Sequence, residues 1–345
     1  MLLTGSLFAC KSPSNAGGAA DALAAPGGGK KISVAFYNVE NLFDTIDNPD
    51  KIDEEFLPEG LYKWTEQVYQ QKLDNLARAI AQLGDADGPE ILGLAEVENR
   101  HVVEDLVQKT VLKGRNYAVV HEESPDMRGI DVALVYDPKT FRYERHKILR
   151  IDFPPEPDYT CRAILLVEGK VRDETLYVLV NHWPSRRGGE SESEFRRLRA
   201  AAVARAATDS LFALNAAAKI LLMGDFNDDP HNRSLTETMQ ASAVPSRIHS
   251  AGFFNPMTAL HDPETLGTLT YQGKWNLFDQ FLVSKALLGG SKLRYIEGSA
   301  AVYNPEFLRV GFGSAKEAPR RSIFRNEFQP EGFSDHFPVY LHLQY

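Results

Sequence analysis

The chain has 345 residues with 38 basic and 47 acidic side chains, so its formal net charge is −9. Apolar residues make up 43%, which excludes a disordered chain, because such chains lack the apolar groups that offset the entropy lost on folding. The two cysteines, Cys10 and Cys161, exclude a disulfide-stapled or zinc-finger fold. No interior apolar run approaches the ~18 residues of a membrane span. The acidic balance disfavours a protein that coats DNA, but not an enzyme that handles one phosphate at a time.

The N-terminus has the features of an export and anchoring segment. Its first ten residues, MLLTGSLFAC, form a short apolar run that ends in a small residue and a cysteine, similar to the cleavage site of bacterial lipoproteins. Residues 11–29 are rich in Ser, Asn, Gly, Ala and Pro, which is typical of a flexible linker. We therefore expect a signal segment (1–10), a linker (11–29) and one domain (30–345), lipid-anchored via Cys10 in the cell envelope or extracellular space. An unstructured, uncleaved N-terminus is the alternative.

Short apolar runs alternate with polar loops over the rest of the chain, without a second linker. The runs predict nine strands: Ile32–Tyr37, Glu90–Ala95, Tyr117–His121, Val132–Tyr136, Ala163–Glu168, Thr175–Val180, Ile220–Met223, Asp279–Val283 and Phe337–Leu343.

Two helices are predicted by apolar residues at helical spacing. The first spans Thr65–Leu83, with Thr65 as its cap. The second spans Ser193–Ala217 and is rich in alanine, with an apolar stripe expected at Phe195, Leu198, Ala202, Leu211 and Leu214. Three segments read as long loops: Arg145–Tyr159, Gln240–Leu269 and Val302–Glu331. Strands mixed with helices over one uninterrupted span favour a single α/β or α+β domain.

Polar residues with catalytic chemistry stand at the ends of six predicted strands. They are Asn38 and Glu40, Glu96, Asn181 and His182, Asp225 and Asn227, Asp279, and Asp335 and His336. Each alone has an ordinary explanation as a turn or loop residue. Because strand ends gather at the rims of a packed sheet, their joint occurrence predicts a pocket of carboxylates, amides and imidazoles. Such oxygen ligands suit Mg²⁺, Mn²⁺ or Ca²⁺.

At these positions the sequence resembles the endonuclease/exonuclease/phosphatase superfamily, which includes DNase I. The matching segments are VAFYNVENLFD (34–44), ILGLAEVEN (91–99), GIDVALVY (129–136), VNHWPS (180–185), LMGDFNDDP (222–230), FDQFLVS (278–284) and GFSDHFPV (332–339). They span the whole domain. The resemblance implies an α+β fold, a four-layer α/β/β/α sandwich of two mixed β-sheets flanked by helices.

The resemblance also implies roles for individual residues. Glu96 is similar to the family's principal metal ligand, with Asn38, Asp335 and, in some members, Glu40 beside it. Asp225 matches the aspartate that activates water, Asn227 its partner, and Asp279 the aspartate that polarises His336. His182 matches a histidine of DNase I-like and phosphatase-like members, where abasic endonucleases have tyrosine. The implied activity is metal-dependent phosphoester hydrolysis.

Three arginines near these motifs are candidate phosphate ligands: Arg128, Arg162 and Arg186. A solvated surface charge is the alternative for Arg128 and for Arg187, which follows Arg186 directly. The segment Arg186–Arg205 holds six arginines against three glutamates, and a phosphate substrate is expected to be steered there.

We expect a monomeric phosphodiesterase acting on nucleic acid or a small phosphoester, with membrane contact only through the lipid anchor. A phosphomonoesterase or phospholipase of the inositol polyphosphate phosphatase or sphingomyelinase type is the alternative. A non-catalytic binding module on the same scaffold is the third possibility.

Overall fold

The structure is a computed structural model that describes residues 29–84, 88–290, 292–312 and 316–345. The expected signal segment (1–10) and the expected linker, except its last residue, lie outside the described residues. Within these ranges no helix combines the length and apolar character needed to cross a membrane.

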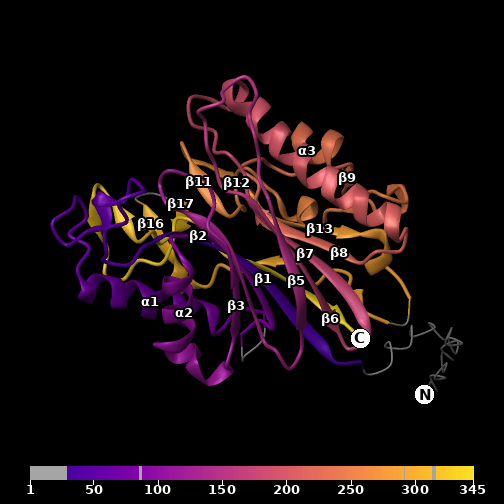
Figure 1. Cartoon of the computed structure of the whole chain (residues 1–345), viewed down its shortest axis with the longest axis horizontal. Helices are drawn as coiled ribbons and strands as arrows, with labels where there is room; N and C mark the ends of the chain where they lie inside the picture. Colours follow the sequence, from indigo (N-terminus) through magenta and orange to yellow (C-terminus); the bar gives the residue numbers. More distant parts are fainter. Residues whose placement is uncertain (1–28, 85–87, 291, 313–315) are drawn as a thin grey trace, which may run out of the picture.

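The first of two seven-stranded sheets contains the N-terminal and C-terminal strands side by side (Figure 1). Its order is β14-β20-β1-β2-β4-β3, with β15 also paired to β20; β1 and β2 are parallel and the other pairs are antiparallel. Its strands are β1 (Lys31–Leu42), β2 (Ile91–Val97), β3 (Ala118–His121), β4 (Asp131–Tyr136), β14 (Arg294–Tyr295), β15 (Ala301–Val302) and β20 (Val339–Gln344).

The second sheet has the order β5-β6-β7-β8-β13-β10-β9 and is also mixed. The pairs β7–β8 and β9–β10 are parallel, and the other pairs are antiparallel. Its strands are β5 (Arg142–Leu149), β6 (Ile164–Val171), β7 (Glu174–His182), β8 (Ile220–Asp225), β9 (Ala241–Ser242), β10 (Phe253–Phe254) and β13 (Asp279–Ser284).

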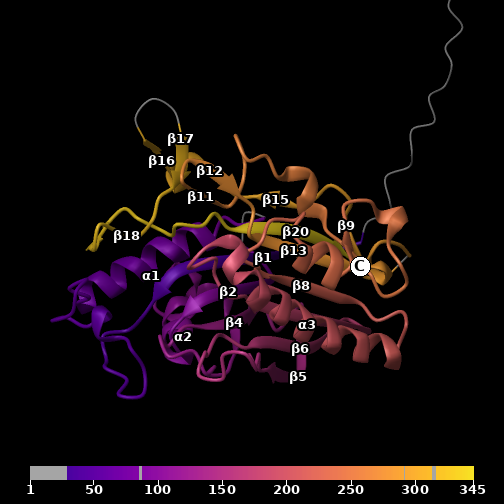
Figure 2. The ribbon, with the colours of Figure 1, turned by 90° about the horizontal axis from the view of Figure 1, so that it is seen from above.

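Three α-helices cover the outer faces of the two sheets. They are α1 (Glu66–Ile80), α2 (Arg100–Gln108) and α3 (Glu190–Leu214). One apolar cluster joins the first sheet to α1 and α2, another joins the second sheet to α3, and a third fills the space between the sheets. Figures 1 and 2 show α1 and α2 on one side of the molecule and α3 beyond the second sheet. The expected four-layer α/β/β/α sandwich is therefore confirmed.

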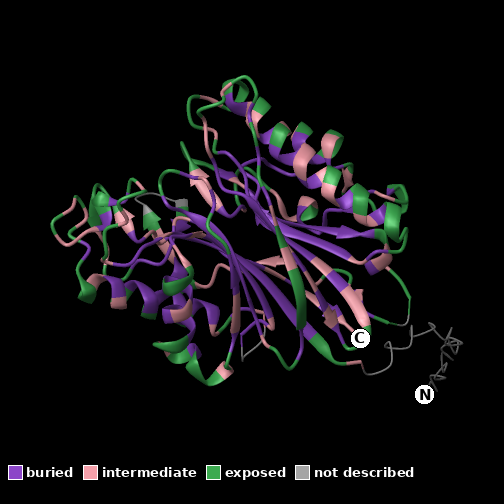
Figure 3. Ribbon diagram, in the orientation of Figure 1, coloured by how far each residue is buried: buried purple, intermediate pink, exposed green. Residues whose placement is uncertain are grey.

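Side chains of the central strands alternate between these clusters, as the two-residue period of a strand requires. On β1, Val34 and Phe36 lie between the sheets, whereas Ala35 and Tyr37 face the helices. The strands are accordingly buried on both faces, and exposed residues concentrate on the outer sides of the helices and in loops (Figure 3). Burial on both faces explains why these strands read as nearly continuous apolar runs.

Smaller elements occupy the connections. Three hairpins project beside the sheets: β11 (Leu269–Tyr271) with β12 (Lys274–Asn276), β16 (Arg309–Phe312) with β17 (Lys316–Pro319), and β18 (Ile323–Phe324) with β19 (Glu327–Phe328). Short helical turns are η1 (Glu54–Phe56), η2 (Val111–Arg115), η3 (Ser234–Thr238), η4 (Pro245–Arg247), η5 (Pro256–Leu260), η6 (Lys285–Leu287) and η7 (Glu306–Leu308). Two of the three expected long loops therefore contain short paired segments.

All nine predicted strands and both predicted helices are present, with shifted ends; besides strands of two to four residues, two longer elements, β5 and α2, were missed. The expected loop from Arg145 begins inside β5, whose residues are mostly exposed; an edge strand of this kind has no apolar alternation to reveal it. Helix α2 is short and starts at its cap Asn99, whose side chain accepts a hydrogen bond from the Val102 amide. The predicted cap Thr65 is confirmed, since it accepts a hydrogen bond from the Val68 amide.

The apolar stripe expected on the second helix was wrong in part. Phe195 and Leu214 are exposed, whereas Leu198, Ala202 and Leu211 are half-buried and Leu211 packs against the core. Helix α3 instead turns its alanines, such as Ala200 and Ala204, toward the second sheet. Small side chains let a helix lie close to a sheet. The positions of the large apolar residues therefore pointed to the wrong face of this helix.

Candidate active site

Three predicted catalytic residues stand in one row across the second sheet. His182 at the end of β7 pairs with Asp225 at the end of β8, and Asp225 pairs with Asp279 at the start of β13. Gly224 permits this close approach, because a Cβ there would lie 2.4 Å from the backbone oxygen of Asn181. The register of three neighbouring strands thus brings together side chains up to about a hundred residues apart in sequence.

The row faces the first sheet. Val180 and Met223, each two residues before a member of the row, lie in the core between the sheets, so His182 and Asp225 point the same way. Across the gap, Asn38 continues the inward face of β1. Its Nδ2 donates to Asp225 Oδ2 at 3.1 Å and to Glu96 Oε1 at 3.3 Å. Asn38 therefore links the two sheets at the site.

Glu96 reaches the site because β2 has a bulge at this residue. The register with β4 shifts between Ala95 and Val97, and Glu96 has a φ of 63°. Strict alternation would place Glu96 with Leu92 and Leu94 on the face toward the helices; the bulge moves Val97 to that face and turns Glu96 inward. A left-handed glutamate is strained, and such strain is concentrated at functional sites.

A second bulge has the opposite effect on Glu40. Here β1 passes through a φ of 51°, and the register with β2 shifts before Leu42. The Glu40 carboxylate accepts hydrogen bonds from the backbone amide of Ser322 and, at 2.7 Å, from its hydroxyl, and lies near the ammonium of Lys72. The structure therefore does not bring Glu40 into contact with Glu96, although sequence reasoning grouped them as metal ligands.

The loop before β20 carries Asp335 and His336. Ser334 Oγ donates to the Asn38 carbonyl at 2.7 Å and accepts from the His336 amide at 3.0 Å, which ties this loop to β1. His336 Nδ1 lies 2.7 Å from Asp279 Oδ2, and its Nε2 lies 3.9 Å from Asp225 Oδ2. Asp335 is one-third exposed, with Oδ1 4.0 Å from His336 Nε2.

Charges in this cluster are set by burial and by these neighbours. Burial opposes a charge on His336, but the Asp279 carboxylate reverses this effect and holds the pKa of His336 well above its usual value. Burial raises the pKa of Asp225 to about 7, although the His336 cation counteracts it. Burial, followed by the cations of Arg162 and Arg128, holds the pKa of His182 well below its usual value. His336 is thus cationic and His182 neutral near pH 7.

Asn227 follows Asp225 in a tight turn. Its amide donates to Asp225 Oδ1 at 2.9 Å, its φ is 51°, and its Nδ2 donates to the Trp183 carbonyl at 2.9 Å. Asparagine tolerates this left-handed conformation better than most residues. The turn orients Asp225 and joins the ends of β7 and β8.

The three candidate arginines have different surroundings. Arg162 is buried, pairs with Asp126 Oδ2 at 3.2 Å and donates to the Trp183 carbonyl at 2.6 Å. Arg128 is half exposed, binds the same aspartate, and acts with Arg162 on the pKa of His182. These two arginines therefore lie on the His182 side of the site.

Arg186 is engaged within the protein. Its guanidinium contacts Asp228 Oδ1 at 3.3 Å and Asp229 Oδ2 at 3.2 Å and lies 4.5 Å from the centre of the Phe278 ring. These contacts leave it less free to bind phosphate than the sequence suggested.

The donor set fits a divalent cation. Asp225, Asp279 and Asp335 surround the His336 imidazole, and Glu96 adjoins Asn38 and His182. Among the described residues, the buried Asp279 Oδ1 has no hydrogen-bond partner. Ligand atoms of Asp225, Asp279 and His336 all lie within 4.8 Å of one another. Because buried carboxylates need compensating charge, the site favours a hard cation with oxygen ligands.

A groove of about 600 Å³ is lined in part by Asn227. Its lining includes Arg187, Phe278 and Tyr271, whose side chain is largely exposed on the β11–β12 hairpin. Sequence reasoning missed Tyr271 and also Asp126, which anchors both arginines. Neither had a local signal, because each acquires its role from segments distant in sequence.

The fold is shared with several solved structures. Truncated Caenorhabditis elegans TDP2 is 18% identical, with 91% of this chain and 98% of that chain covered and a TM-score of 0.53. The human Nocturnin catalytic domain with bound sulfate is 16% identical (91% and 94% covered, TM-score 0.54). D. rerio TDP2 complexed with a single-strand DNA product is 13% identical (91% and 99% covered, TM-score 0.54). At these identities the similarity establishes the fold.

No curated protein matches the sequence. The model of the endonuclease/exonuclease/phosphatase family matches residues 33–345, which include every side chain of the site described above. The chain therefore belongs to the endonuclease/exonuclease/phosphatase family and is a phosphoester hydrolase.

Proposed function

We propose that the protein is a divalent-cation-dependent phosphodiesterase that cleaves nucleic acid. The observation that carries this proposal is the pairing of a proton acceptor and a cationic donor: Asp225 lies 3.9 Å from His336, which Asp279 holds in its charged form. Hydrolysis of a phosphoester by water requires both, one to accept a proton from water and one to stabilise negative charge on the phosphoryl oxygens.

Each residue then has a defined task. Glu96 and Asp335 hold the cation, for which Mg²⁺, Mn²⁺ and Ca²⁺ are the candidates. The cation polarises a phosphoryl oxygen when bound. Asn38 orients Glu96 and Asp225 through its two hydrogen bonds, so its role is alignment, since its own oxygen accepts the Glu40 amide.

Asp225 accepts the proton of the attacking water, and its pKa of about 7 suits a base that works near neutrality. His336 donates a hydrogen bond to the phosphoryl group as a cation, whereas His182 donates through a neutral ring.

The groove beside Asn227 favours a polymeric substrate. An exposed Tyr271 ring offers a stacking surface for a base, and Arg187 offers a cation for a neighbouring phosphate. The D. rerio TDP2 structure, which has the same fold, holds a single-strand DNA product. Arg128, whose charge acts on His182, is our candidate to contact the phosphate that is cleaved.

The test is a substrate panel with the purified protein in Mg²⁺, Mn²⁺ and Ca²⁺. The panel contains plasmid DNA, single-stranded DNA, RNA, inositol polyphosphates and sphingomyelin vesicles. We expect cleavage of nucleic acid, and a loss of at least about 10²-fold in kcat for Asp225→Asn. Asp173→Asn, in the exposed turn between β6 and β7, is the matched control with unchanged activity.

Failure to cleave any nucleic acid would overturn the proposed substrate class. Phosphate release from inositol polyphosphates, or phosphocholine release from vesicles, would assign the alternative phosphomonoesterase or phospholipase activity. Full activity in Asp225→Asn would overturn the assignment of the base.

A further inference from the structure

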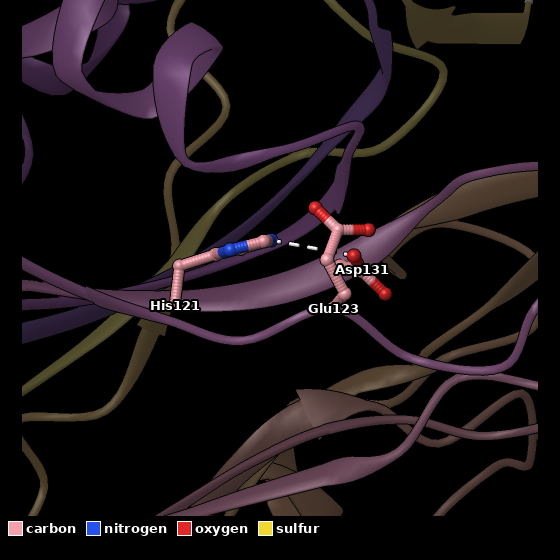
Figure 4. A group of neighbouring side chains, drawn as sticks. All are labelled: His121, Glu123 and Asp131. Atoms are coloured by element: carbon pink, nitrogen blue, oxygen red, sulfur yellow. Dashed lines mark ion pairs between the residues drawn. The ribbon is translucent and has the colours of Figure 1, made fainter. Parts of the chain in front are cut away.

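A second cluster of ligand-type side chains lies on the first sheet, at the adjoining ends of β3 and β4. His121 closes β3, Glu123 follows two residues later, and Asp131 opens β4 (Figure 4). His121 pairs with Ala133, two residues after Asp131 in β4, and Glu123 lies just beyond the end of this ladder. Residues two apart share one face of a strand, which places all three side chains together.

The ligand atoms of this cluster converge, and His121 forms an ion pair with Asp131. His121 Nε2, Asp131 Oδ2 and a Glu123 oxygen lie within 4.8 Å. His121 and Asp131 are almost fully buried, and neither Nε2 nor Oδ2 has a hydrogen-bond partner among the described residues. They stand 3.3 Å apart but are not aligned for a hydrogen bond.

That separation matches two ligands of one ion. Ligands bound at about 2.1 Å lie about 3.0–3.4 Å apart in octahedral or tetrahedral coordination. Buried polar atoms without a hydrogen bond are costly, and a shared cation would remove the cost for both. In Figure 4 the imidazole points toward the two carboxylates.

We propose that His121, Glu123 and Asp131 form a metal site separate from the catalytic centre, specific for a first-row transition dication such as Zn²⁺ or Mn²⁺. One imidazole with two carboxylates favours these ions over Mg²⁺ and Ca²⁺, which prefer oxygen ligands alone. The backbone amide of Ser124 donates to Asp131 Oδ1 at 2.9 Å and so orients Oδ2 toward the ion. Glu123 is exposed, which provides the path of entry.

The site joins both ends of the loop 122–130, and this loop reaches the catalytic centre. Asp126 within it holds Arg162 and Arg128, whose charges act on His182. Lys51 holds the same loop through the carbonyls of Ser124 and Asp126. Metal binding therefore fixes the loop that positions the arginines.

The test measures binding rather than catalysis. The full chain carrying Glu96→Gln, which weakens the catalytic cation site, is stripped with a chelator and titrated calorimetrically with Zn²⁺, Mn²⁺, Mg²⁺ and Ca²⁺. We expect one equivalent of Zn²⁺ or Mn²⁺ to bind, at least about tenfold tighter than Mg²⁺ or Ca²⁺. Adding Glu123→Gln should weaken the binding of Zn²⁺ or Mn²⁺ at least about tenfold. Metal binding should slow hydrogen exchange in residues 122–130 only when Glu123 is intact.

The matched control is Glu122→Gln, since Glu122 is equally exposed but contacts His146 instead, and its metal affinity should not change. Asp131→Asn tests a buried ligand, with its melting curve in chelator confirming that it folds. The proposal would be overturned if the Glu96→Gln chain bound no equivalent of Zn²⁺ or Mn²⁺. It would also be overturned if adding Glu122→Gln or Glu123→Gln gave the same metal affinity. Because the chain tested has an altered catalytic site, either outcome is independent of the proposed nuclease activity.

Discussion

His336 shows how one residue obtains its chemistry from a neighbour. A buried imidazole alone would be neutral, but Asp279 lies 2.7 Å from its Nδ1 and keeps it charged. Sequence reasoning anticipated this pair, and the structure confirms it. His182, equally buried but beside arginines, has its pKa moved in the opposite direction.

The first prediction concerns Asp279→Asn. His336 acts as a cation, and its raised pKa keeps it protonated, and the enzyme active, as pH rises. Without the Asp279 carboxylate this pKa falls, so the loss of activity with rising pH should begin at a lower pH. We expect the alkaline limb of kcat/KM against pH to move down by at least about one unit, with kcat reduced by at least about 10²-fold. An unmoved alkaline limb would contradict the role given to Asp279.

A second residue with a shifted pKa is Glu98, which lies outside the catalytic cluster. Burial raises its pKa to about 8, while the Asp44 amide, which donates to Glu98 Oε2 at 2.7 Å, opposes the shift. The folded state thus binds a proton that the unfolded state has released above about pH 4.5. Stability should therefore fall as pH rises from about 4.5 to 8.

Glu98→Gln keeps the hydrogen-bond acceptor and removes this proton linkage. We expect similar free energies of unfolding for both proteins at pH 4.5, and a variant more stable by about 2 kcal/mol or more at pH 8.5. Urea unfolding in chelator measures both, with Glu104→Gln as control, since Glu104 is only half-buried on α2. A difference that does not change with pH would refute the linkage.

Among the elements, α1 does more than cover the first sheet. Its buried Lys72 donates to the carbonyls of Glu40 at 2.9 Å and Phe333 at 2.8 Å, and to Ser322 Oγ at 2.6 Å. Its Asn75 donates to two further carbonyls of the segment 330–332. The helix therefore holds the bulge of β1 and the loop that leads to Asp335 in place together.

The prediction for this element is that Lys72→Met destabilises the protein by about 3–5 kcal/mol, because a buried charge and two carbonyls lose their partner. Where the variant remains folded, kcat should fall, since Asp335 and His336 depend on the Phe333 contact. Adding Glu40→Gln removes the uncompensated carboxylate and should restore part of the stability. If the double variant is no more stable than Lys72→Met, the two side chains are not coupled; thermal unfolding decides this.

At the scale of the whole molecule, the basic stretch after His182 does not form a free cationic surface. Five of its six arginines have partners within the protein: Arg186, Arg196, Arg197, Arg199 and Arg205. Among the described contacts of this stretch, Arg187 has no carboxylate partner, and it lines the groove beside Asn227. Electrostatic attraction of a phosphate substrate to this region therefore depends on few residues. This agrees with the net charge of −9, which gives the whole chain no excess of cations.

The location of the whole chain is a separate prediction. We propose that Cys10 carries lipid and tethers the domain to a membrane. Cys10→Ser should move the protein from the membrane fraction to the soluble fraction of the producing bacterium, while kcat of the purified domain stays unchanged. A wild-type chain that is found entirely in the soluble fraction would contradict the anchor.

The sequence alone determined a single domain of mixed strands and helices and most of the site, because apolar runs define strands and their polar ends mark the rim. The four-layer sandwich followed from the resemblance to the family. His182, Asp225, Asp279 and His336 were predicted in this way and lie together. Tertiary structure decided what depends on local backbone geometry or distant partners. Two bulges send Glu96 inward and Glu40 away, although both follow a strand in the same manner. Side chains alternate between the two faces of a strand only where its hydrogen-bond ladder is regular. A bulge at a single left-handed residue therefore changes the face on which that side chain lies.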